Sequence, residues 1–212
     1  MSRNLTIFIS IAVLIVAITL AWFLFFRGPG PIKNYPPANP SGEIVAFGDS
    51  LVEGVGSTEG KDLVSLLSAE LGKPIINFGR SGDTTESALN RTQEIFKEVS
   101  NPKVAIILLG GNDFLRKVPK EETFKNLGII IDEFQKRGAV VLLLGIRGGV
   151  LSDSFEEEFE IIQKTYQTAY VPNVLKGLLG DSRYMYDSIH PNSAGYQKIA
   201  EKVVPTLKML SE

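Results

Sequence analysis

The sequence contains no cysteine and only one histidine, His190. The absence of cysteine excludes disulfide bonds, thiolate metal sites and a cysteine nucleophile. An excess of charge of one sign is also lacking, because 22 Lys and Arg nearly balance 24 Asp and Glu. No strong electrostatic field therefore points to nucleic acid or to an acidic polymer as a partner. Histidine is the usual general base near neutral pH, so a mechanism of that kind must use His190.

A long apolar run, residues 5–26, opens the chain and contains no charged residue. A helix of this length, rising about 1.5 Å per residue, spans the roughly 30 Å hydrocarbon core of a bilayer. The run is longer than the apolar region of a signal peptide and ends in aromatic residues, which are typical of the membrane interface. We interpret residues 1–27 as an uncleaved single-pass anchor. The alternatives are a cleaved signal peptide and a soluble helix.

The charges around this run do not decide its orientation. Arg3 lies before the run, and Arg27 and Lys33 come after it, so the positive-inside bias is nearly balanced. Residues 28–42 are rich in proline and glycine, which predicts an extended linker between the anchor and a folded domain. The remainder, residues 43–212, is roughly 170 residues long, which suits one domain with a substantial core.

Short β-branched apolar runs alternate with amphipathic ones after the linker. The runs that predict buried strands are residues 43–47, 74–78, 104–109 and 139–144. The patterns that predict helices are residues 61–71, 84–99, 120–137, 154–166 and 193–210, the last broken or kinked near Pro205. This alternation favours right-handed βαβ units, and hence a three-layer α/β fold with a parallel sheet covered on both faces.

Polar and glycine-rich segments come directly after each predicted strand. They are residues 48–51 (GDSL), 79–83 (GRSGD), 110–113 (GGND) and 145–149 (GIRGG), and residues 187–191 (DSIHP) precede the last helix. Ligands of open parallel sheets bind beyond the carboxyl ends of the strands. We therefore expect the functional side chains to come from these segments.

Acyl transfer needs residues of the kinds found in these segments. A serine hydroxyl is a weak nucleophile and requires a base, for which Ser50 and His190 are the candidates. Asp187 is close enough in sequence to orient the imidazole of His190. Backbone N–H groups of Ser50 and Gly79 and the Asn112 amide could bind a developing oxyanion. Each residue by itself is more typical of a cap, turn or surface loop than of catalysis, and the hypothesis depends on their combination.

These segments together resemble the SGNH, or GDSL-type, hydrolase superfamily. The four namesake residues correspond to Ser50, Gly79, Asn112 and His190, and the resemblance covers roughly residues 43–210. Within the superfamily, the motif LLGGNDFLR and the short domain are most similar to the thioesterase I/lysophospholipase L1 and arylesterase branch. The resemblance implies a flavodoxin-like fold with a five-stranded parallel sheet, whose fifth strand would fall near residues 171–175, and no metal or organic cofactor.

The resemblance also implies a serine esterase that cleaves carboxylic esters or thioesters of small molecules or lipids through an acyl-enzyme. In it Ser50, His190 and Asp187 form the catalytic triad, and Ser50, Gly79 and Asn112 form the oxyanion hole. Asp49 and Asp113 are expected to brace their loops. Phe114, Leu115, Val150 and Leu151 suggest an apolar acyl site. We expect a monomer whose domain faces the extracytoplasmic side.

Two other functional classes stay open at this stage. An acyltransferase, or an O-acetylesterase of envelope glycans, would use the same architecture, because acceptor choice depends on pocket access and water exclusion. A catalytically silent anchored binding module would keep the fold alone. Arg147 could contact substrate, or it could be a solvated loop residue.

Overall fold

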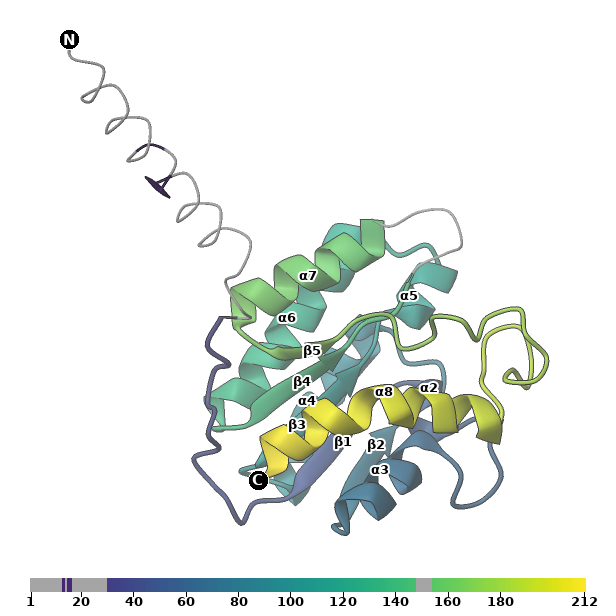
Figure 1. Cartoon of the computed structure of the whole chain (residues 1–212), viewed down its shortest axis with the longest axis horizontal. Coiled ribbons are helices and arrows are strands. Elements are labelled where there is room, and N and C mark those ends of the chain that lie inside the picture. The colour runs from purple at the N-terminus through teal and green to yellow at the C-terminus, as the bar shows by residue number, and fades with distance from the viewer. Residues whose placement is uncertain (1–12, 14, 17–29, 148–153) are drawn as a thin grey trace. The chain divides into compact units, whose positions relative to one another are not determined.

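The computed structural model describes residues 13, 15–16, 30–147 and 154–212. The chain divides into two compact units, residues 1–31 and residues 32–212. The predicted anchor lies mostly outside the described residues. Among those that the structure does describe, no helix is long and apolar enough to cross a membrane. Figure 1 shows the arrangement of the elements within residues 32–212.

Five strands form one parallel sheet. They are β1 (Ile44–Gly48), β2 (Ile75–Gly79), β3 (Val104–Leu108), β4 (Val140–Leu144) and β5 (Ala169–Val171). Their order in the sheet is β2-β1-β3-β4-β5. This is the flavodoxin-like order, and it confirms the predicted sheet. The chain turns in opposite directions on leaving β1 and β3, so the crevice between their carboxyl ends is where such folds bind ligands.

Helices cover both faces of the sheet. They are α2 (Ser50–Glu53), α3 (Leu63–Leu71), α4 (Thr85–Glu98), α5 (Gly111–Leu115), α6 (Lys120–Lys136), α7 (Ser154–Tyr166) and α8 (Ser193–Ser211). Helices α3 and α8 pack together on one face, and α4, α6 and α7 lie on the other (Figure 1). β1, β3 and β4 are buried along their whole length, as expected of strands covered on both faces.

The structure differs from the sequence-based prediction at three places. β5 is shorter and earlier than expected, because Pro172 cannot donate to the ladder and pairing stops at Val171. Helix α8 continues through Pro205, where the buried neighbours Val203 and Leu207 hold both halves in the core. Helices α2 and α5 were not predicted, since four or five residues are too few to show a helical period.

Part of the predicted linker belongs to the folded unit. Ile32 packs against the core, and the Lys33 N–H donates to the Gln167 carbonyl at 2.9 Å. The Asn34 amide donates to the carbonyls of Gln135 and Ala139 at 2.8 and 3.0 Å. A soluble version of the domain should therefore begin at residue 32, because a start near residue 41 would remove these bonds.

Candidate active site

Ser50, His190 and Asp187 form a continuous chain of hydrogen bonds. The Ser50 Oγ lies 3.0 Å from His190 Nε2, and His190 Nδ1 lies 2.8 Å from Asp187 Oδ2. The other carboxylate oxygen, Asp187 Oδ1, accepts the backbone N–H groups of Ile189 and His190 at 2.8 and 2.7 Å. The two predicted partners of the serine are thus brought to it from the loop before α8. The arrangement is a nucleophile bonded to a base that is in turn bonded to an acid.

The surroundings of Asp187 keep its carboxyl group ionised. The hydrogen bond from the His190 side chain, followed by those from the two backbone N–H groups, lowers the pKa of Asp187 to about 2. An ionised carboxylate at this position can accept a hydrogen bond from the N–H of Nδ1, and it stabilises the positive charge of an imidazolium. Nε2 of His190 is then left free to accept the hydroxyl proton of Ser50.

The turn after β1 presents Ser50 at the end of the strand. The Asp49 carboxylate accepts the Leu51 N–H at 3.0 Å and caps α2, in agreement with its expected bracing role. Gly48 lets this turn close against β3, because a Cβ there would collide with the Leu108 carbonyl oxygen. The turn is therefore a strand–turn–helix in which Ser50 is the first helical residue.

Asn112 reaches the same region from the neighbouring strand. Gly110 precedes α5 with φ 109°, a conformation that favours glycine. The Asn112 amide Nδ2 donates to the Asp83 carbonyl at 2.9 Å and lies 3.5 Å from Asp49 Oδ2. Asp113 is fully buried and accepts the N–H and the hydroxyl of Thr85 at 2.9 and 2.6 Å, which fastens α5 to α4.

The geometry corrects the expectation for Gly79. Its N–H already donates to the Asn77 side chain, at 2.8 Å. Glycine is required at this position for packing, because a Cβ would collide with the backbone of Glu53 in α2. Gly79 therefore positions α2 against β2 and does not offer a free donor.

Gly82 lies in the same segment and was not identified from the sequence as a candidate oxyanion donor. It has φ 82° and precedes Asp83, whose carbonyl accepts from Asn112. Within the described parts of the chain, no hydrogen bond is assigned to the N–H of Gly82 or of Ser50. The sequence does contain a signal for this donor, because Gly82 and Asp83 directly precede Thr84, the N-cap of α4. Free N–H groups are common where a loop leads into the start of a helix.

A pocket of about 180 Å³ opens beside the Ser50 hydroxyl. Its apolar walls include Phe114 and Leu115, as expected, while the predicted Val150 and Leu151 lie outside the described residues. Arg147 also lines it, and the full set is Asp49, Ser50, Leu51, Gly111, Asn112, Phe114, Leu115, Ile146, Arg147, Leu175, Leu179, Ser188, Ile189 and His190. The walls are mostly apolar, which suits a hydrocarbon chain.

A buried ion pair supports this end of the sheet. Arg91 Nε donates to Asp83 Oδ2 at 2.6 Å, and its Nη2 donates to the carbonyls of Gly48 and Phe78 at 3.1 and 2.9 Å. Arg91 thus connects the carboxyl-terminal ends of β1 and β2 to the segment that contacts Asn112. The sequence did not reveal this role, because an arginine in an amphipathic helix is typical of the solvated face.

Burial gives Asp49 an unusual titration. Desolvation is the largest cause that raises its pKa to about 7, against the lowering effect of the Leu51 N–H and His190. Because the folded protein binds this proton more tightly than the unfolded chain, the contribution of Asp49 to stability is fully present below the unfolded pKa of 3.8 and is lost as pH rises toward 7.

We expect Asp49→Asn to remove this pH dependence. Between pH 4 and 7 the free energy of unfolding of the parent should fall relative to that of the variant, by at most about 1.4 kcal/mol per pH unit. Urea unfolding at several pH values measures the difference, and Asp62→Asn, at the cap of α3, is the control. Parallel curves for the parent and Asp49→Asn would contradict the raised pKa.

Comparison with known proteins identifies the family. Residues 46–198 match the GDSL-like lipase/acylhydrolase family. The chain belongs to this family. Esterase TesA of Pseudomonas aeruginosa is 32% identical over 178 residues, which cover 79% of this chain and 88% of the relative. An arylesterase of Vibrio mimicus is 30% identical over the same shares of the two chains.

Solved structures agree with the sequence relatives. A crystal structure of TesA has a TM-score of 0.72 and 31% identity, covering 79% of this chain and 99% of that one. The esterase EstA from Pseudoalteromonas sp., inhibited by monoethylphosphonate, has a TM-score of 0.72 and 26% identity, covering 80% of this chain and 98% of that one. The protein is therefore a hydrolase of ester bonds with the SGNH hydrolase fold, as the motifs predicted.

Proposed function

We propose that the protein is a serine esterase in which Ser50 is the nucleophile, His190 the general acid and base, and Asp187 the residue that orients His190. The observation that carries this proposal is the hydrogen-bond chain from Ser50 Oγ through His190 to Asp187, at 3.0 and 2.8 Å, beside an apolar pocket. His190 Nε2 accepts the hydroxyl proton as Ser50 Oγ attacks the carbonyl carbon of the ester.

The negative charge that develops on the carbonyl oxygen needs donors in place before the reaction. In this proposal the N–H groups of Ser50 and Gly82 and the side-chain amide of Asn112 supply them. The Asn112 hydrogen that faces Asp49 makes only a 3.5 Å contact, so it is the one available to an oxyanion. The hydrogen bond to the Asp83 carbonyl holds the rest of the amide in position.

Collapse of the tetrahedral intermediate completes the first half of the reaction. His190 returns the proton to the leaving alcohol or thiol, and the acyl group stays on Ser50 Oγ. Water then enters, His190 takes its proton, and the second tetrahedral intermediate releases a carboxylic acid and restores the serine.

The walls of the pocket and the relatives indicate the substrate class. Apolar side chains such as Phe114, Leu115 and Leu175 suit the acyl chain of a carboxylic ester or thioester. The relatives named esterase, arylesterase and thioesterase 1/lysophospholipase L1, the last from Escherichia coli, support the same range.

Residues 1–27 attach this domain to a membrane in our proposal, with the domain on the extracytoplasmic side. The support is the uncharged apolar run of residues 5–26 and its aromatic end. Protease added to intact cells should digest the domain of the full-length protein. Protection of the domain in intact cells but not in lysed cells would contradict this orientation.

The esterase proposal is tested on residues 32–212. This unit contains the whole sheet and its core, and 79% of this chain is enough to match 99% of the TesA crystal structure. We expect hydrolysis of p-nitrophenyl esters from acetate to longer acyl chains. A phosphonate inhibitor should form one adduct, located on Ser50 by peptide mass spectrometry. A protein that turns over no ester or thioester would contradict the proposal. Faster product release with an added alcohol would indicate acyl transfer to that acceptor.

A further inference from the structure

Exposed apolar side chains gather around the mouth of the pocket beside Ser50. Five large ones are between 38% and 68% exposed: Phe114, Leu115, Leu179, Tyr186 and Ile189. Four of them, all but Tyr186, also line the pocket. The other exposed large apolar side chains of residues 32–212 are spread over separate elements, namely Tyr35 before β1, Ile129 in α6, Ile161 in α7 and Met209 in α8.

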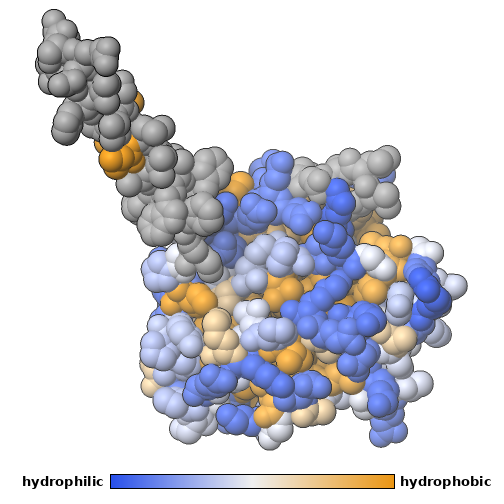
Figure 2. Space-filling model, viewed as in Figure 1, coloured by the Kyte–Doolittle hydropathy of each residue, from blue (hydrophilic) through white to orange (hydrophobic). Residues whose placement is uncertain are grey.

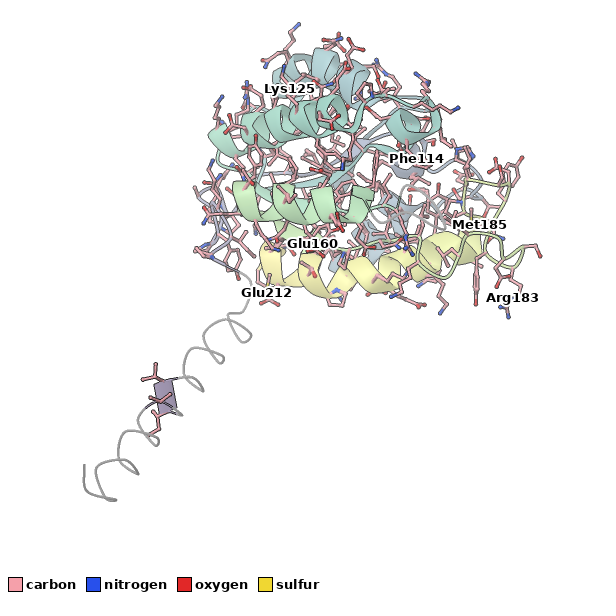
Figure 3. The ribbon with its side chains drawn as sticks, turned by 90° about the horizontal axis from the view of Figure 1, so that it is seen from above. Phe114, Lys125, Glu160, Arg183, Met185 and Glu212 are labelled. Carbon is pink, nitrogen blue, oxygen red and sulfur yellow. The ribbon has the colours of Figure 1, made fainter. Side chains whose placement is uncertain are left out.

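Three separate segments supply this rim, and each also carries an exposed cation. Lys117 lies two residues after Leu115 at the end of α5, and Lys176 stands beside the pocket residue Leu175. Arg183 lies in the loop that leads to Tyr186. Figure 3 shows Phe114, Arg183 and Met185 toward one end of the domain, with Glu212 at the other. On the face in Figure 2, hydrophobic and hydrophilic surfaces adjoin at the end that carries α2 and α5.

The charges at this rim are unbalanced in favour of cations. In the described parts of the chain, neither Lys117 nor Lys176 has an ion-pair partner. The two carboxylates of the rim loops are engaged, Asp181 by Arg183 at 2.6 Å and Asp187 by His190. Whole-chain charge does not explain this, because the protein carries a net charge of -2. Free cations beside exposed apolar side chains are the pattern that binds anionic lipid surfaces.

We propose that the rim formed by Phe114, Leu115, Leu179, Tyr186 and Ile189, flanked by Lys117 and Lys176, docks onto an anionic lipid surface. The apolar side chains enter the headgroup region and the two ammonium groups lie against lipid phosphates. The pocket then opens directly toward the acyl chains, so an amphiphilic ester passes from the lipid to Ser50 with its chain out of water. The pocket's part in catalysis rests on the proposed function, whereas docking by itself does not.

The experiment measures flotation of residues 32–212 with vesicles in a Ser50→Ala background, so that no lipid is hydrolysed. We expect binding to equimolar phosphatidylglycerol and phosphatidylcholine, and much weaker binding to phosphatidylcholine alone. Lys117→Gln with Lys176→Gln should weaken binding about 25-fold, since each cation near such a surface contributes about fivefold. Tyr186→Ser should weaken it on both vesicle types. The matched controls are Lys125→Gln in α6 and Ile161→Ser in α7, which should bind like the parent.

Activity on soluble p-nitrophenyl butyrate separates docking from catalysis. With Ser50 restored, the Lys117→Gln, Lys176→Gln variant should hydrolyse this ester at the parent rate, because neither lysine lines the pocket. Equal binding to both vesicle types, no binding to either, or the same affinity for the double lysine variant and Lys125→Gln would overturn the docking proposal. If the protein with Ser50 in place hydrolyses no ester while vesicle binding is as expected, the esterase proposal is overturned and the docking proposal is not.

Discussion

Replacing Ser50 with Ala is expected to lower kcat/KM for ester hydrolysis by about 10⁴- to 10⁶-fold, and replacing His190 as well should cost almost nothing further. In the proposed mechanism the Ser50 hydroxyl and the His190 imidazole, 3.0 Å apart, act together. Removal of either group therefore abolishes the catalytic contribution of the other. The residual rate would come from binding and from the oxyanion donors, which both substitutions leave in place.

The measurement is kcat/KM of Ser50→Ala, His190→Ala and the double variant on one p-nitrophenyl ester. Ser188→Ala is the matched control, because Ser188 lines the same pocket but is not a hydrogen-bond partner of His190 among the described contacts. Its rate should stay near that of the parent. Additive losses in the double variant, or a collapse in Ser188→Ala, would contradict the assignment of the nucleophile. Thermal unfolding of each variant shows whether the fold is intact.

Among the substitutions considered for stability, replacement of Arg91 should lower the free energy of unfolding most. We expect Arg91→Met to lower the free energy of unfolding by about 3–5 kcal/mol, because it leaves the Asp83 carboxylate buried without its partner. The carbonyls of Gly48 and Phe78, near the site ends of β1 and β2, also lose one donor each, while the Gly48 carbonyl keeps the Arg80 N–H at 3.0 Å. Urea unfolding measures the loss.

Two further variants test the cause of this loss. Asp83→Asn combined with Arg91→Met should recover part of the stability, since the uncompensated charge is gone. The matched control is Arg183→Met, which breaks a similar Arg–Asp pair at the surface, where water screens the charges, and which should change stability little. Similar losses for Arg183→Met and Arg91→Met would indicate that burial is not the cause.

The sequence by itself determined the fold class and supplied the residues of the proposed triad. The continuous apolar runs at β1, β3 and β4 indicate strands buried on both faces, and glycine and polar residues come directly where the strands end. With a single histidine in the chain, the general base had no competitor. Ser50 and Asn112 stand at adjacent strand ends, so the sheet topology accounts for their proximity.

Only the tertiary structure decided which glycine N–H of residues 79–83 is already hydrogen-bonded and which contacts support this end of the sheet. Gly79 and Gly82 are alike in sequence, but the N–H of Gly79 is taken by Asn77, and Gly79 is needed against α2. The Arg91–Asp83 pair was also invisible, because the helix pattern does not show what lies above a strand end. Short-range periodicity reports which face of an element is buried, whereas hydrogen-bond partners and close approaches depend on how separate elements meet.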